Sequence, residues 1–308
     1  MCIRDRYKSI TDSDKNTKLR FERFTHDKSD MSSISGNSIY DIYEDRCGVL
    51  WFGTDWDGVN KYDPNDDAFK HYHSFIKNDD SGTDDAVYAL YKDKTGILWL
   101  GTRGNGLISF DMEKGIFKSH IHDQYNSNSI SNNVVRSIYE DRAGRFWIGT
   151  EIGFNQFDRS TGKFKRYYLD PDDPGLTNIV YIYEDRESNL WLGAWDGGLS
   201  KFNTETKKFT LYQNDPENSH SFPDNIVWCI TEDLQNQLWI GTDKNGLLKY
   251  DREKDQFISF KNDENDPNSI SDNKVLTIYV AQNGDIWLGT TTGLNLSLIH
   301  ISEPTRPY

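Results

Sequence analysis

Thirteen aromatic, charged and amide residues stand at variable positions of an otherwise regular sequence, and their types suit recognition of a sugar-like ligand. Aromatic ring faces stack on C–H surfaces, while carboxylate, amide and guanidinium groups form hydrogen bonds with hydroxyl groups. We therefore predict that an oligosaccharide or another small polar ligand contacts these thirteen residues: Trp56, Asp57, Arg103, Asn105, Glu151, Trp195, Asp196, Asp243, Asn245, Tyr40, Tyr88, Arg136 and Trp228.

These positions are singled out because the sequence contains several copies of one unit. Positions that are identical in every copy are explained by packing, whereas positions that vary but stay polar or aromatic are free for recognition. The alternative is that the aromatic residues fill gaps between copies. Packing and binding explain Trp56 and Trp195 equally well, while packing explains Tyr40 and Trp228 better.

Histidines, acidic residues and the usual catalytic motifs do not form a recognisable metal or catalytic site in the sequence. The pairs His71/His73 and His120/His122 have the spacing of metal ligands on one strand face, but they fall on outer strands and out of register. Acidic runs at 170–173 and 263–266 match no calcium-loop spacing. With no catalytic triad, carboxylate pair or phosphate loop, we predict no catalytic residue, metal or cofactor.

The repeated unit is marked by six tryptophans, spaced 48, 48, 44, 48 and 48 residues apart: Trp51, Trp99, Trp147, Trp191, Trp239 and Trp287. Each lies in an apolar-Trp-apolar-Gly-Thr run such as 98–102, with Ala194 replacing the threonine once. A further glycine follows six or seven residues after each tryptophan. Agreement at so many offsets in six copies establishes an internal repeat.

Each copy is expected to form four short strands separated by Asp, Gly and Asn turns. In the second copy the strands are expected at about 87–92, 97–102, 107–111 and 117–122. Four-stranded units at this period indicate the blades of an all-β propeller. In such a blade the loop after the second strand and the start of the first strand lie on one face, which brings the thirteen candidate residues together.

Composition excludes several classes of partner. The 308 residues carry a formal net charge of −14, and such a surface repels phosphate backbones and anionic lipid. No apolar run is long enough for a bilayer span, so this segment is expected to make no direct membrane contact and to bind no nucleic acid. Three scattered cysteines are too few for a disulfide framework or a zinc site.

The two ends depart from the repeat. Residues 1–6 and 297–308 resemble translated sequencing-library adapter and are expected to be non-native, which leaves a propeller over residues 7–296. Segments 7–10 and 21–24 match the third and fourth strands of a blade, and the copy at Trp287 supplies only a second strand and the start of a third. Five full and two partial blades are compatible with a closed six-bladed ring, but we expect a fragment of a seven-bladed one.

The motif Ile138-Tyr139-Glu140-Asp141-Arg142-Ala143-Gly144-Arg145-Phe146-Trp147-Ile148-Gly149-Thr150 resembles the two-component regulator propeller repeat, and segments 128–134 and 268–273 resemble the family's interblade segment. The resemblance covers about residues 7–296, with departures at turns 231–234 and 279–282. It implies the periplasmic, oligosaccharide-binding sensor region of a hybrid histidine kinase, with a kinase module downstream and a homodimer in the full-length sensor. The alternatives are a secreted propeller enzyme acting on glycans, either a lyase or a glycosidase, and a protein-interaction scaffold.

Overall fold

The computed structural model describes residues 5–9, 19–45, 48–55, 57–63, 68–72, 86–169, 178–215, 217–218 and 221–297. For residues 5–9 and 19–23 only the backbone is described. The chain divides into two compact units, Met1–Ile138 and Tyr139–Tyr308, and each is treated by itself. The boundary between them falls inside strand β11.

The first unit contains a strand pair and two complete blades. Strands β1 (Asp5–Ser9) and β2 (Leu19–Arg23) form an antiparallel pair. The first blade comprises β3 (Ile39–Glu44), β4 (Leu50–Thr54), β5 (Val59–Asp63) and β6 (Ala68–Tyr72). The second comprises β7 (Val87–Lys92), β8 (Leu98–Thr102), β9 (Leu107–Asp111) and β10 (Ile116–His120).

Four further sheets follow in chain order. The third blade, whose first strand spans the unit boundary, comprises β11 (Val135–Glu140), β12 (Phe146–Thr150), β13 (Phe154–Asp158) and β14 (Lys163–Tyr167). The fourth comprises β15 (Ile179–Glu184), β16 (Asn189–Ala194), β17 (Leu199–Asn203) and β18 (Phe209–Tyr212). The fifth comprises β19 (Val227–Glu232), β20 (Leu238–Thr242), β21 (Leu247–Asp251) and β22 (Gln256–Phe260). The sixth has three described strands: β23 (Val275–Val280), β24 (Ile286–Thr290) and β25 (Leu294–Ser297).

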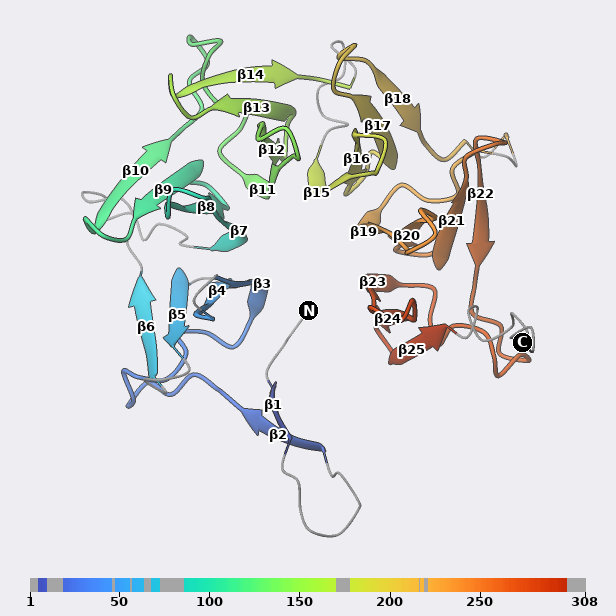
Figure 1. Ribbon diagram of the computed structural model, residues 1–308, viewed down its shortest axis with the longest axis horizontal. Helices are drawn as coiled ribbons and strands as arrows, with labels where there is room; N and C mark the ends of the chain where they lie inside the picture. The colour runs from blue at the N-terminus through green and yellow to red at the C-terminus, as the bar shows by residue number, and fades with distance from the viewer. Residues whose placement is uncertain are drawn as a thin grey trace, which may run out of the picture. The chain divides into compact units, whose positions relative to one another are not determined.

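This architecture confirms the predicted all-β propeller of four-stranded blades. In the second repeat the observed strands lie within two residues of the predicted ones. In each unit the first strands, such as β15, β19 and β23, lie on the inside, and fourth strands such as β18 and β22 lie on the outside (Figure 1). Strand β1 begins at Asp5 and β25 ends at Ser297, while the non-native origin of the two ends and the seven-bladed ring stay predictions.

The repeated tryptophans hold neighbouring blades together. Trp191 of the fourth blade packs in one cluster with Val227 and Ile230 of the fifth, and Trp239 of the fifth packs with Val275 of the sixth. The side chains of Trp51, Trp147, Trp191 and Trp239 are at most 2% exposed. Burying an aromatic side chain of this size removes a large apolar area from water, so this position is fixed by the stacking of blades.

A repeated aspartate stabilises the turn before each of these tryptophans by accepting several hydrogen bonds. Asp233 shows the pattern: one carboxylate oxygen accepts the backbone N–H groups of Gln235 and Gln237 at 2.9 Å, and the other accepts the Trp239 indole N–H at 2.8 Å. The same indole bond is formed by Asp45, Asp93, Asp141 and Asp185. Asn236 occupies the left-handed position of this turn with a φ of 66°, where four other copies have glycine.

Candidate functional site

The loop after each second strand lies beside the start of the first strand of the same blade, as predicted. Backbone hydrogen bonds of 2.9–3.3 Å join the two segments in four blades: Asp55 N to Ser38 O, Arg103 N to Ala86 O, Trp195 N to Asn178 O, and Asp243 N to Ile226 O. The two sets of candidate residues therefore lie on one face within each of these blades.

In the second unit this face carries a cluster that we call the tryptophan patch, formed by Trp195, Trp228, Asp243 and Lys274. The rings of Trp195 and Trp228 meet edge to face, with centroids 4.9 Å apart. Trp228 donates its indole N–H to Asp243 at 3.1 Å. Trp195 is 39% exposed, whereas Trp228 is half-buried, so Trp195 presents the larger open aromatic surface.

Lys274 completes the tryptophan patch and was missed in the sequence. Its ammonium group lies 2.7 Å from Asp243 and 4.9 Å from the centre of the Trp228 ring. Burial alone would raise the pKa of Asp243, but hydrogen bonds from Lys274 and Trp228 outweigh it and lower that pKa. The sequence contained a usable signal, because alternate strand residues share a face and Lys274 stands two residues before Leu276, which is equivalent to Trp228.

In the first unit the equivalent positions form a second cluster, the tyrosine patch, made of Tyr40, Tyr88 and Arg136. The two tyrosine rings meet edge to face with centroids 4.8 Å apart, and the Arg136 guanidinium lies 4.3 Å from the centre of the Tyr88 ring. Burial and a hydrogen bond to Asp55 raise the pKa of Tyr40 to about 12. Tyr40 and Asp55 repeat the arrangement of Trp228 and Asp243 at the same positions of another blade.

The remaining candidates occupy different environments. Asp57, Arg103 and Asp196 are exposed, Glu151 is half-buried and Asn105 is buried. The amide of Asn245 donates to Pro223 O at 2.8 Å and accepts from Lys261 at 2.6 Å, so both of its polar atoms already have protein partners. Trp56 lies outside the described residues.

The histidines of the two pairs that the structure describes have structural surroundings. His122 contacts Ile130 O through Nδ1 at 2.8 Å, and Asn214 and Asn262 donate the equivalent bond in two other copies. Because asparagine must donate here, we infer that His122 carries its proton on Nδ1. Burial lowers the pKa of His120 to about 4. Among the described residues no group of three or more His, Cys, Asp or Glu side chains forms a metal site, and His73 and the acidic run 170–173 lie outside them.

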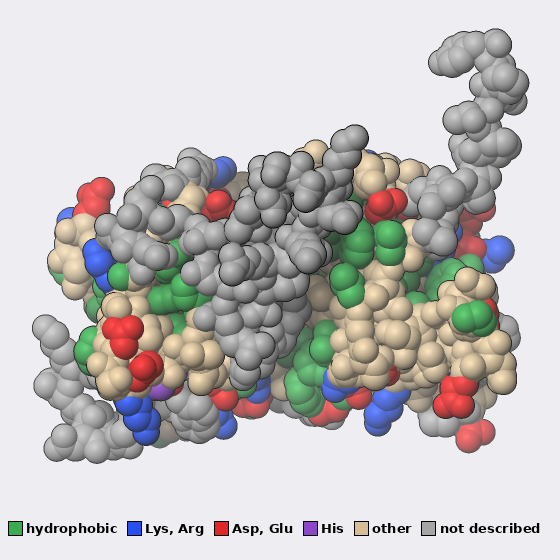
Figure 2. All heavy atoms as spheres, turned by 90° about the horizontal axis from the view of Figure 1, so that it is seen from below, with side chains coloured by type: hydrophobic (Ala, Val, Ile, Leu, Met, Phe, Trp, Pro, Cys, Tyr) green, Lys and Arg blue, Asp and Glu red, His purple; other side chains and the backbone are tan. Residues whose placement is uncertain are grey.

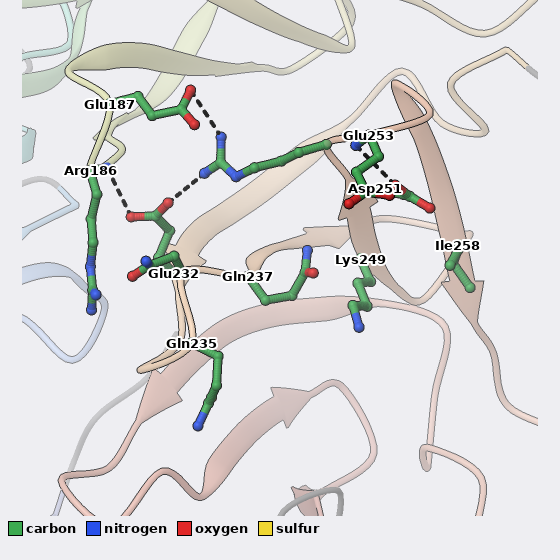
Figure 3. A pocket seen from close by; sticks show the side chains of 11 residues that line it. Arg186, Glu187, Glu232, Gln235, Gln237, Lys249, Asp251, Glu253 and Ile258 are labelled. Atoms are coloured by element: carbon green, nitrogen blue, oxygen red, sulfur yellow. Dashed lines mark hydrogen bonds and ion pairs between the residues drawn. The ribbon is translucent and has the colours of Figure 1, made fainter.

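A cavity of about 520 Å³ lies between the fourth and fifth blades, at the turns that join first to second and third to fourth strands. Figure 3 shows Glu187 and Glu232 directed towards the same guanidinium group, which belongs to Arg252. Arg252 also reaches Asp185 at 3.3 Å, so one cation joins three carboxylates from two blades. This cavity is lined by structural ion pairs and lies on the face opposite the tryptophan patch.

Among the residues that the structure describes, the face shown in Figure 2 has no continuous stripe of Lys and Arg side chains. Lys, Arg, Asp and Glu side chains are interspersed in Figure 2, with hydrophobic side chains exposed between them. Across the part of the chain that the structure describes, no helix is both long and apolar enough to cross a membrane.

Comparison with known proteins identifies the repeat. The sequence matches the two component regulator propeller family at residues 33–56, 81–104, 129–151, 221–244 and 269–292. Each match covers the segment before a first strand and continues to the loop after a second strand. The repeat at Trp191, which follows the one 44-residue step, is not among the matches. No curated protein matches the sequence.

Solved structures share the fold at low identity. The extracellular domain assigned to a hybrid two-component system from B. thetaiotaomicron is 22% identical, with a TM-score of 0.70 over 91% of this chain and 36% of that one. The domain assigned to a one-component system of the same bacterium is 20% identical, with a TM-score of 0.68 over 96% and 40%. Virginiamycin B lyase from Staphylococcus aureus is 16% identical, with a TM-score of 0.59 over 85% of both chains.

The present chain thus spans little more than a third of the length of the two B. thetaiotaomicron domains, and the likeness to all three structures concerns the fold. The repeats themselves are the more specific finding, because they agree in motif, period and blade structure. Five of the six repeats of this chain are two-component regulator propeller repeats.

Proposed function

We propose that this chain is part of the extracellular, ligand-sensing region of a two-component sensor and that it binds an oligosaccharide or a similar polar ligand at the tryptophan patch. The observation that carries the proposal is the exposed ring of Trp195 beside the charged pair Asp243–Lys274. An open aromatic face with polar groups at its rim suits a sugar ring, which offers C–H surfaces and hydroxyl groups together.

The sensor role and the periplasmic location draw support from the family and from similar structures. Two of those structures are extracellular domains assigned to bacterial signalling systems. In this proposal the propeller itself performs no catalysis. The signal of ligand binding reaches a kinase module through a homodimer of the full-length sensor.

The test is a binding screen of purified chain against neutral and acidic oligosaccharides, read by thermal shift and then by calorimetry. A hit should lose at least tenfold affinity in Trp195→Ala and retain it in Tyr125→Ala, because Tyr125 is 90% exposed on the loop between β10 and β11 and is not one of the candidate residues. The sequence further predicts that combining Trp195→Ala with Trp56→Ala abolishes binding. Equal affinity in the Trp195 and Tyr125 variants would refute this site.

A glycan-cleaving enzyme is the second candidate, and a virginiamycin B lyase shares the propeller fold at 16% identity. Turnover of an oligosaccharide by the purified chain, lost on replacement of one carboxylate such as Asp243, would establish it. A protein-interaction scaffold would instead be indicated by a partner that co-purifies while no sugar changes the melting temperature.

A further inference from the structure

Three cationic side chains gather between the third and fourth blades, on the face opposite the tryptophan patch. Arg145 lies in the turn between β11 and β12, Lys165 lies on β14, and Lys207 lies in the turn between β17 and β18. Arg145 and Lys207 both donate to the carbonyl oxygen of Thr204. Their charged groups each lie 5.7 Å from the centre of the Trp147 ring, so two cations share one carbonyl oxygen and one aromatic ring.

The third cation, Lys165, lies in the same row of the sheet as this ring. The strand register pairs Trp147 with Gln156 and Gln156 with Lys165. Burial lowers the pKa of Lys207, and the positive charges of Arg145 and Lys165 lower it further. Like charges that affect one another in this way repel, so the arrangement has a free-energy cost that a bound anion would remove.

The protein supplies one carboxylate to this cluster. Asp141 accepts from the Arg145 guanidinium at 2.6 Å and from the Trp147 indole N–H at 2.7 Å. Three cations and one carboxylate leave a formal charge of +2, in a chain whose net charge is −14. Among the described residues no acceptor bonds the ammonium group of Lys165, and that of Lys207 donates to one backbone carbonyl. Several N–H donors of the cluster thus remain for a ligand.

The next junction, between the fourth and fifth blades, has the same framework without these cations. Its equivalent positions are occupied by uncharged or acidic residues: Asn189, Thr210 and Asp255. Lys207 and Asp255 both adopt the left-handed backbone conformation, with φ values of 60° and 52°. Asp255 accepts the hydroxyl groups of Tyr212 and Tyr250 at 2.8 and 2.7 Å. Blade packing therefore does not require a cationic cluster at this position of the repeat.

We propose that Arg145, Lys165 and Lys207, which together we call the cationic junction, bind a phosphate or sulfate group. Inorganic phosphate and sulfate carry up to two negative charges at neutral pH, which balances the formal charge of the cluster. Their oxygens accept several charge-assisted hydrogen bonds at once, from the planar guanidinium and from the two ammonium groups. This site is additional to the tryptophan patch and does not depend on the proposed function.

The first test measures how fast individual lysines of the wild-type chain are acetylated by acetic anhydride, read by peptide mass spectrometry. Sodium sulfate is compared with sodium chloride at equal ionic strength. Because only the unoccupied site reacts, Lys207 should be acetylated about tenfold more slowly when sulfate reaches about ten times its dissociation constant. Lys249 is the matched control, since its ammonium group lies 5.8 Å from the centre of the Trp239 ring but outside the cationic junction. Equal rates at Lys207 in the two salts, or equal slowing at Lys249, would overturn the proposal.

The second test is calorimetric titration of variants with sulfate. Lys207→Met and Lys165→Met should each lose the saturable heat of binding, whereas Lys249→Met and Trp195→Ala should keep it. Heat that persists in both cluster variants would contradict the site, and its retention in Trp195→Ala separates this result from oligosaccharide binding.

Titration with glucose 6-phosphate distinguishes a free ion from a phosphorylated ligand. Tighter binding than inorganic phosphate assigns the cationic junction to a phosphorylated ligand, and weaker binding assigns it to the free ion. An absence of saturable heat with sulfate, phosphate and the sugar phosphate alike would overturn the proposal.

Discussion

The tryptophans of this chain fall into two groups that differ in burial and in hydrogen bonding. Five of the six second-strand tryptophans, such as Trp147, are buried, and each of these five donates its indole N–H to an aspartate six residues earlier. Trp195 lies four residues after Trp191 in the same blade but is 39% exposed on a loop. Tryptophans thus have two roles in this chain, packing between blades and exposure on a loop, and the position of a tryptophan within the repeat determines its role.

The largest expected effect is the loss of stability when a buried second-strand tryptophan is replaced. Trp147→Ala should lower the free energy of unfolding by about 3–5 kcal/mol, because it opens a cavity at a blade junction and leaves Asp141 without its indole partner. Trp287→Ala should cost less than half as much, since Trp287 is half-buried and Ala281 replaces the aspartate. Urea unfolding of both variants measures this, and equal losses would contradict the assigned role of the junction.

The aspartate of the turn should have the next largest effect. Asp233→Ala leaves the Trp239 indole N–H and two backbone N–H groups of the turn without their acceptor and should cost about 1–3 kcal/mol. The matched gain is Ala281→Asp, which restores the repeat motif in the sixth blade and should stabilise it by about 1 kcal/mol. The melting temperature should fall in Asp233→Ala and rise in Ala281→Asp. A fall in the first variant without a rise in the second would show that the turn of the sixth blade is not equivalent to that of the fifth.

Asp41 tests whether a variable position can also be structural. It stands at a position that differs in every copy, yet it accepts the Leu90 N–H of the next blade at 2.6 Å, and burial raises its pKa to about 6. A raised carboxyl pKa means that the folded state holds the proton more tightly. The contribution of Asp41 to stability therefore grows as pH falls, by about 1.5 kcal/mol from pH 8 to pH 5.

Unfolding of the wild type and of Asp41→Asn at the two pH values measures this contribution. The stability of the wild type relative to the variant should be greater at pH 5 than at pH 8. A difference that does not change with pH would show that Asp41 titrates normally and belongs with the solvent-facing residues.

Repetition explains why the fold and its packing residues followed from the sequence. Six copies of one unit reveal the period, the strand order and the tryptophan at each junction without any structure. The candidate site was harder, because its residues vary by definition. The sequence marked Trp195, Trp228 and Asp243 as candidates, and their role in binding stays a prediction. The bond between Lys274 and Asp243 and the two bonds of the Asn245 amide depend on contacts between loops and blades, which the sequence does not reveal.

The smallest expected change in stability belongs to the residue on which the functional account depends. Trp195→Ala should alter the free energy of unfolding by less than about 1 kcal/mol, because the side chain is exposed on a loop. Calorimetric titration of this variant and of the wild type with an oligosaccharide found in the screen is the most direct test. The account predicts an unchanged fold with at least tenfold weaker binding, and undiminished affinity would contradict it.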